Sequence, residues 1–136
     1  MNLSSNLILP KSSSSAISFS LKFGLPLFIG LLLHLGFAPF HFPGLSILSV
    51  GLFYLRLQNN TVKSAAINGL LFGLGFFSFG VSWIYVSVHT YGHLAMLVAA
   101  FITFIFILYL SLYYVILGAS YSLFTQYTTS SINRGL

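Results

Sequence analysis

Long uncharged apolar runs alternate with short polar segments along this chain. No charged residue lies between Lys22 and Arg56, and none lies between Ser64 and Asn133. As a single helix the first run would be about 50 Å long, which exceeds the ~30 Å hydrocarbon core of a bilayer. Each run therefore predicts a pair of helices joined by a turn.

Proline and glycine mark the turns. Pro39 and Pro43 divide the first run because proline lacks an N–H and disfavours helix in the preceding residue. Tyr91-Gly92-His93 divides the second run. The pattern predicts an all-α polytopic membrane protein with about four transmembrane helices. Their expected bounds are residues 19–37, 45–57, 65–88 and 94–117, the last with an aromatic extension to 127.

Polar segments flank this transmembrane module of residues 19–127. Residues 1–18 are rich in serine and predict a mobile cytoplasmic leader, and residues 128–136 predict a polar tail. A cleaved signal peptide is the alternative for the N-terminus, with a small-x-small site at Gly36-Phe-Ala38. Pro39 would directly follow the cut, so the leader is favoured.

The charged residues are few, and they indicate the solvent of the chain and its orientation. Only 4% of residues are charged, against about 25% in soluble domains, which predicts lipid as the solvent. The formal charge of +5 comes from isolated cations, which excludes the clustered basic face of a nucleic-acid binder. These cations are Lys11, Lys22, Arg56, Lys63 and Arg134.

The positive-inside rule orients these helices. With four crossings all the cations fall on one side, and the turns at Pro39 and at Gly92 fall on the other. Both termini are then cytoplasmic and both turns lie on the opposite, outer face. The second helix is short for a full crossing, so a re-entrant helix stays open. Re-entry would move Arg56 and Lys63 outside, so the rule favours a crossing.

A ladder of small residues lies on the third predicted helix. Ala65, Gly69 and Gly73 follow one another at a spacing of four and share one helix face. Gly118 and Ser122 repeat the spacing near the end of the fourth helix. Small residues let helix backbones approach closely in membranes, so these positions predict helix packing.

The side chains present exclude most catalytic chemistry. The chain has no Cys, Asp or Glu, so it lacks both a thiolate and the carboxylate of a catalytic triad. His89 and His93 have a spacing that can bind a metal on a helix, but Gly92 lies between them and no carboxylate completes a site. We therefore expect no metal, no cofactor and no catalysis by these residues alone.

Aromatic residues gather at the outer end of the third predicted helix. Trp83, Tyr85 and Tyr91 lie there with the hydroxyl of Ser82 and the flexible Gly92. One interpretation is an interfacial aromatic belt, in which amphipathic rings settle at the headgroup level. The other is a lipid-access wall that guides an acyl chain or headgroup of a membrane phospholipid. Composition alone leaves both open.

Several short motifs together resemble those of apolipoprotein N-acyltransferases over about residues 36–118. The motifs are Gly36-Phe-Ala-Pro-Phe40, Lys63-Ser-Ala-Ala66, Gly73-Leu-Gly-Phe-Phe77, Ser82-Trp-Ile-Tyr-Val-Ser87, Tyr91-Gly92 and Leu108-Tyr-Leu-Ser-Leu-Tyr113. The resemblance implies an enzyme with membrane helices and a periplasmic nitrilase-like domain that carries a Glu-Lys-Cys triad. Such enzymes move an acyl chain from phospholipid to the N-terminal diacylglyceryl-cysteine of lipoproteins.

The resemblance covers only the N-terminal membrane portion of the proteins in that family. No catalytic residue of the family maps onto a position here, so we expect a fragment or split subunit that is inactive alone. A separately encoded catalytic half is the expected partner. The sequence does not distinguish a frameshift product from a functional subunit. A different class of protein is also an alternative, namely a stand-alone small membrane protein that is structural or assists transport.

Overall fold

The protein is a bundle of helices. The structure is a computed structural model that describes residues 11–37, 42–58 and 60–134. Every secondary-structure element in these ranges is helical, which confirms the predicted all-α class. The elements are α1 (Lys11–Leu35), α2 (Pro43–Leu57), α3 (Val62–Gly80), α4 (Trp83–Val86), the π-helix η1 (Ser87–Tyr91) and α5 (Met96–Arg134).

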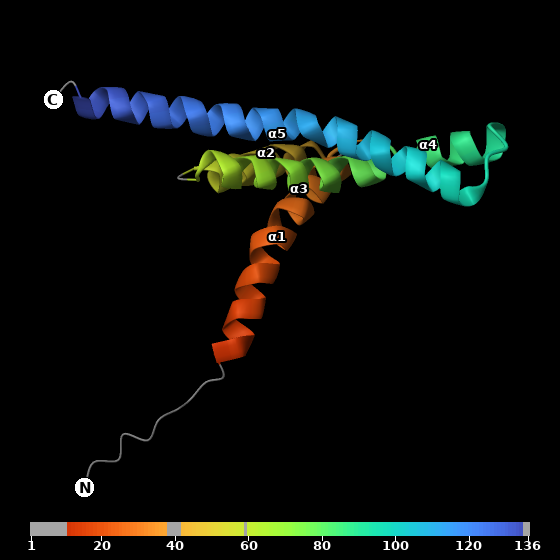
Figure 1. Cartoon of the computed structure of the whole chain (residues 1–136), viewed down its shortest axis with the longest axis horizontal. Coiled ribbons are helices and arrows are strands. Elements are labelled where there is room, and N and C mark those ends of the chain that lie inside the picture. The colour runs from red at the N-terminus through yellow and green to blue at the C-terminus, as the bar shows by residue number, and fades with distance from the viewer. Residues whose placement is uncertain (1–10, 38–41, 59, 135–136) are drawn as a thin grey trace, which may run out of the picture.

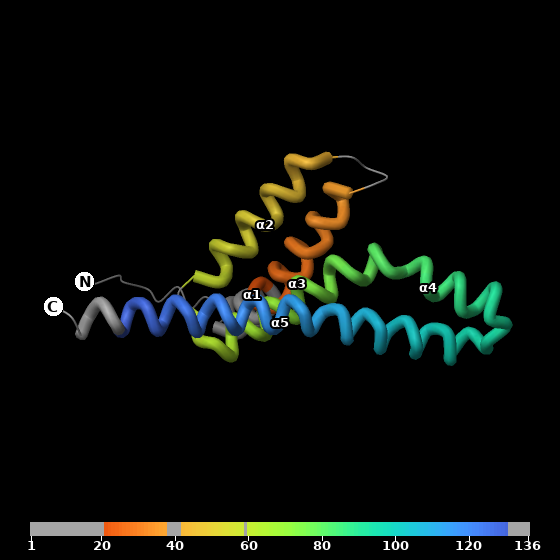
Figure 2. Tube along the Cα trace, turned by 90° about the horizontal axis from the view of Figure 1, so that it is seen from above, coloured from red at the N-terminus to blue at the C-terminus, as the bar shows by residue number. Residues whose placement is uncertain are grey.

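Helix α3 is the centre of the bundle. It packs lengthwise against α5, whereas α1 crosses it at an angle (Figures 1 and 2), and α2 packs mainly against α1. Helices α3 and α5 lie along the long axis of the molecule (Figure 1), and α1 and α2 form a hairpin that leans away from them (Figure 2). The connection between α2 and α3 lies at the same end as the C-terminal part of α5, whereas α4 lies at the opposite end (Figure 1).

Small residues set the close approach of α3 to its neighbours. A Cβ atom on Gly73 would lie 2.9 Å from the Ser111 Cα, and one on Gly69 would collide with the Tyr114 carbonyl. On the opposite helix, a Cβ on Gly118 would lie 2.6 Å from the Ala65 carbonyl oxygen. The ladder of small residues therefore faces α5, with backbone against backbone.

Aromatic rings fill the space between α2, α3 and α5. The rings of Phe53 and Phe72 stack with centroids 4.1 Å apart. Tyr114 meets the Phe72 ring edge-on at 4.9 Å. Offset stacks and edge-to-face contacts are the favoured arrangements of aromatic rings, so this cluster fixes how the helices sit against one another. The buried core around it comprises Ile29, Leu33, Phe53, Leu57, Ala65 and Phe72.

Two of the described helices are long and apolar enough to cross a membrane. They are α3 and the segment Met96–Ser130 of α5, whose most apolar window has a mean hydropathy of 2.4. Only 22% of that window is buried inside the bundle, so most of its apolar surface needs lipid or another apolar cover. Two further segments, Leu21–Leu35 and Pro43–Leu57, are apolar but shorter.

The third helix differs from its predicted bounds. One helix was expected over residues 65–88, but α3 ends at Gly80, where Val81 leaves helical geometry at φ −113° and ψ 0°. The Ser82 hydroxyl donates to the Phe79 carbonyl at 2.9 Å. Such local bonds compete with the helical ladder. The chain then resumes as α4 and the five-residue π-helix η1.

The last helix continues through the predicted polar tail. Helix α5 is unbroken from Met96 to Arg134, although the sequence suggested a tail from residue 128. Its threonines donate to carbonyls of the preceding turn, Thr125 to Tyr121 and Thr129 to Thr125. Polar residues here therefore satisfy their hydroxyls within the helix, and polarity does not end it.

The start of the chain also differs in its helical extent. Helix α1 begins at Lys11, inside the segment predicted as a mobile leader, and it ends at Leu35. The rest of that leader, residues 1–10, lies outside the described residues, as does Pro39 of the first predicted turn. Pro43 begins α2, where its missing N–H leaves no helical bond unmade.

Candidate functional site: the aromatic hairpin

The candidate site is a hairpin that extends the bundle at the end away from the α2–α3 connection. Helix α4, the π-helix η1, the turn at residues 92–95 and the first turns of α5 form this aromatic hairpin (Figure 1). Helix α4 and η1 pack against the start of α5. The hairpin contains the site residues predicted from sequence, Ser82, Trp83, Tyr85, Tyr91 and Gly92, within it or at its start.

The turn of the hairpin is built differently from the sequence-based expectation. Gly92, proposed as the flexible exit from the helix, has φ −83° and is not left-handed. The left-handed residue is His93, at φ 51°. Histidine tolerates this region better than most residues with a side chain. Gly92 is needed for another reason, since a Cβ there would lie 2.6 Å from the Val88 carbonyl oxygen.

His89 holds the two arms of the hairpin together. Its Nδ1 lies 3.0 Å from the Leu94 carbonyl oxygen, across the turn. Its ring stacks on Tyr85 with centroids 5.6 Å apart and an interplanar angle of 20°. These contacts give the ring a structural role. In the described part of the chain, no three His, Cys, Asp or Glu side chains come together as a metal site would require.

The other aromatic side chains of the hairpin point outward. Trp83 is 64% exposed and Tyr91 is 80% exposed. No ring contact joins them, so the structure pairs Tyr85 with His89 and leaves Trp83 and Tyr91 apart. The apolar surface continues over Met96 and Leu97, which are also exposed.

The exposed surface of the hairpin is mainly aromatic and apolar. The Ser82 hydroxyl donates to the Phe79 carbonyl near the end of α3. The hairpin carries no Lys or Arg, so it has no permanent positive charge for an anion. Exposed Trp and Tyr rings with a polar edge are the side chains that settle at a membrane–water interface.

The comparison with known proteins assigns these residues to a family. Residues 29–132 match the model of the apolipoprotein N-acyltransferase N-terminal domain. The chain belongs to the apolipoprotein N-acyltransferase family. The matched range includes α2, α3, the whole aromatic hairpin and most of α5, so the predicted site lies entirely within it.

Individual relatives agree with this assignment. The chain is 40% identical to the apolipoprotein N-acyltransferase of Pseudomonas syringae pv. tomato over 66% of its own length and 18% of the relative. It is 37% identical to that of Coxiella burnetii over 74% of its length and 21% of the relative. It is 36% identical to that of Vibrio cholerae over 63% of its own length and 17% of the relative. The chain thus spans about a fifth of the length of its relatives.

A second feature of this family member was missed from the sequence. At the end of the bundle opposite the hairpin, polar side chains join α1, α2, α3 and α5. The Arg56 guanidinium donates to the Lys22 carbonyl at 3.3 Å, and the Asn60 amide donates to the Arg56 carbonyl. Ser64 donates to the Asn60 side chain at 3.1 Å, and Ser122 donates to the Asn60 carbonyl at 2.8 Å. The isolated cations were the only sequence signal, and they gave no indication of a network.

Proposed function

We propose that this chain supplies the N-terminal membrane module of a bacterial apolipoprotein N-acyltransferase. The observation that carries the proposal is the family match over residues 29–132. The complete enzyme would transfer an acyl chain from a membrane phospholipid to the N-terminal cysteine of a lipoprotein. The residues present include no Cys, Asp or Glu, so the thioester and its catalytic carboxylate must come from outside them. A separately encoded catalytic half is one source.

The proposed topology has four crossings in the inner membrane, with both termini cytoplasmic. Lys22, Arg56 and Lys63 gather at one end of the bundle, where Arg56 reaches the Lys22 carbonyl and both lysines line one pocket. Cations on one side only are the signature of a cytoplasmic face. Helix α2 has 15 residues, or about 22 Å, so its crossing relies on local thinning or on Arg56 extending to the interface.

The same topology accounts for the aromatic hairpin. Helix α3 has 19 residues, or about 28 Å, which matches the hydrocarbon core of ~30 Å. With Val62 at the cytoplasmic interface, α4 and η1 would lie at the headgroups of the outer leaflet. We propose that Trp83, Tyr85 and Tyr91 form a lipid-facing wall there, beside the path by which phospholipid reaches the catalytic domain.

Topology can be tested by single-cysteine labelling, because the chain has no cysteine of its own. Gln58 and His93 are suitable positions because both are exposed. In whole cells with a permeable outer membrane, the His93→Cys variant should react with a membrane-impermeant maleimide and the Gln58→Cys variant should not. Labelling at Gln58→Cys without cell lysis would contradict the four-crossing arrangement.

Function can be tested with a chimera. Residues 29–132 would replace the corresponding segment of the Pseudomonas syringae enzyme, and the chimera would be the sole N-acyltransferase in a depletion strain. We expect it to sustain N-acylation of lipoproteins, measured by mass spectrometry of their N-terminal peptides. The corresponding Coxiella burnetii segment is the matched control. If the control chimera is active and this one is inserted at equal abundance but inactive, the proposal is wrong.

A further inference from the structure

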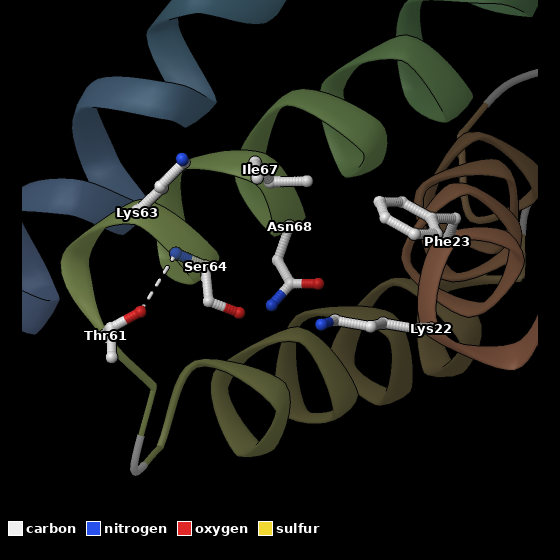
Figure 3. Close-up of a pocket in the computed structure, with 7 residues that line it drawn as sticks. All are labelled: Lys22, Phe23, Thr61, Lys63, Ser64, Ile67 and Asn68. Carbon is white, nitrogen blue, oxygen red and sulfur yellow. Dashed lines mark hydrogen bonds between the residues drawn. The ribbon is translucent and has the colours of Figure 1, made fainter. Parts of the chain in front are cut away.

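A pocket opens at the cationic end of the bundle, away from the aromatic hairpin. It has a volume of about 270 Å³ and lies between α1 and the first turns of α3. Lys22 enters it from α1, and Asn68 enters it from α3 (Figure 3). Lys63 is exposed at its rim. The pocket therefore brings one cation and an amide together from separate segments of the chain, and a second cation lies at the rim with its ammonium group directed away from them (Figure 3).

No carboxylate side chain lies beside the lysines of this pocket. These 136 residues include no Asp or Glu, so neither lysine pairs with a carboxylate side chain among them. Arg56 adds a third cation at the same end, where it donates to the Lys22 carbonyl at 3.3 Å. The first turn of α3 also contributes the partial positive charge of a helix N-terminus. The positive electrostatic potential of these cations and of the helix N-terminus favours an anion in the pocket.

Asn68 is the observation that points to a ligand. Its side chain is buried, with only 4% of the residue exposed, and it points into the pocket (Figure 3). No hydrogen bond joins its amide to another described residue. The amide faces the pocket, so a group bound there would supply the hydrogen-bond partner that the described residues do not.

The remaining polar groups of the pocket are already engaged. Ser64 donates its hydroxyl to the Asn60 side chain at 3.1 Å. The Thr61 hydroxyl accepts the Ser64 backbone N–H at 3.3 Å and thereby caps α3 (Figure 3). These bonds hold the first turn of α3 in place. The groups left for a ligand inside the pocket are the Lys22 ammonium group, which donates, and the Asn68 amide, whose nitrogen donates and whose oxygen accepts (Figure 3).

An apolar side borders the donors. Ile67, which is 38% exposed, and Phe23 line the same pocket. A ligand that fits both sides carries negatively charged oxygen atoms on one part and hydrocarbon on another. A phospholipid meets this description because its phosphate can accept from several donors while its acyl chains lie along the apolar surface of the helices.

We propose that this pocket binds the phosphate of an anionic phospholipid headgroup, with Lys22 and Asn68 as donors and Lys63 at the rim. The proposal rests on the membrane insertion proposed above but not on acyl transfer, and it holds for either orientation of the bundle. A bound headgroup would anchor the connection between α2 and α3 to the membrane surface. Free inorganic phosphate shares the recognised chemistry and is separated from lipid by the test.

The test is lipid retention by the purified full-length chain. The delipidated chain in mild detergent would be mixed with equal amounts of phosphatidylglycerol and phosphatidylcholine, and bound lipid would be counted by native mass spectrometry. The wild type should prefer the anionic lipid. Lys22→Gln should lower that preference about fivefold, as expected for one cation at a lipid surface, and Lys63→Gln should lower it less. Lys11→Gln removes the same charge about 16 Å further along α1 and is the matched control, expected to have no effect.

A further variant separates a built pocket from general attraction between cations and anionic lipid. Asn68→Leu keeps the size and charge of the side chain but removes its donor, and it should also lower the preference for phosphatidylglycerol. Wild-type retention after Asn68→Leu, with Lys22→Gln and Lys11→Gln equally weakened, would overturn the pocket in favour of diffuse attraction. Equal retention in every variant would also overturn it. Complete displacement of phosphatidylglycerol by millimolar inorganic phosphate would show that the pocket binds free phosphate, and it would overturn the proposal that the ligand is a lipid.

Discussion

The approach of α3 to α5 provides the sharpest test of how this bundle is held together. Gly69 has no room for a side chain, because an added Cβ would collide with the backbone carbonyl of Tyr114. Backbone cannot rotate away as a side-chain end can, so Gly69→Ala must separate the two helices. Helices in lipid associate through close packing and not through the hydrophobic effect, so a separation acts directly on the main attraction.

The magnitude follows from two opposing terms. Overpacking of a closely packed contact typically costs about 1–3 kcal/mol. Replacing glycine by alanine inside a helix contributes up to about 1 kcal/mol in the other direction. Because the collision at Gly69 is with backbone, we expect a net loss of about 1–2 kcal/mol in the free energy of unfolding. Gly73→Ala should lose less, since its Cβ would lie 2.9 Å from the Ser111 Cα.

The chain offers a matched control for this substitution. Gly51 also lies inside a helix, α2, but an added Cβ would meet nothing within 4 Å. Gly51→Ala should therefore be neutral or stabilising by up to about 1 kcal/mol. Both variants make the same chemical change, so their difference isolates the steric term at the α3–α5 contact.

Unfolding by sodium dodecyl sulfate in mixed micelles measures these differences. Near-ultraviolet circular dichroism follows the loss of the stacked core, in which the Phe53 and Phe72 rings lie 4.1 Å apart. The midpoint should fall for Gly69→Ala and hold or rise for Gly51→Ala. If both variants are as stable as the wild type, the helices do not need this close approach and the reasoning is wrong.

Two further predictions concern the hairpin and the polar end. In the active chimera, Trp83→Ala should lower the initial rate of lipoprotein N-acylation several-fold at unchanged abundance, whereas Leu55→Ala, which truncates an equally exposed apolar side chain on α2, should not. Equal rates for both would leave only an interfacial belt at Trp83. Ser122→Ala removes the donor to the Asn60 carbonyl and should lower the free energy of unfolding by about 1 kcal/mol, measured by the same titration, while Ser78→Ala, which loses a bond within its own helix, should cost less. An equal cost for the two serines would show that the bond between helices carries no extra stability.

The sequence by itself determined the helical class and the positions at which the helices pack against one another. Uncharged apolar runs indicated helices because no other local structure buries such stretches in lipid. The spacing of Ala65, Gly69 and Gly73 indicated a packing face, because residues four apart lie on one side of a helix. These features depend on near neighbours in the chain, so a pattern can reveal them. The motifs that resemble the family are likewise local, and the comparison with known proteins agreed with them.

Tertiary structure alone decided the details that depend on contacts between segments. The sequence pointed to Gly92 as the special turn residue, but the left-handed position is His93, in a turn that the contact between His89 and the Leu94 carbonyl spans. At the polar end of the bundle, the isolated cations gave no local indication of a network. Lys22 and Asn68 line one pocket only because α1 packs against α3, so an unpaired amide and an isolated cation become neighbours through the fold and not through their spacing in the chain.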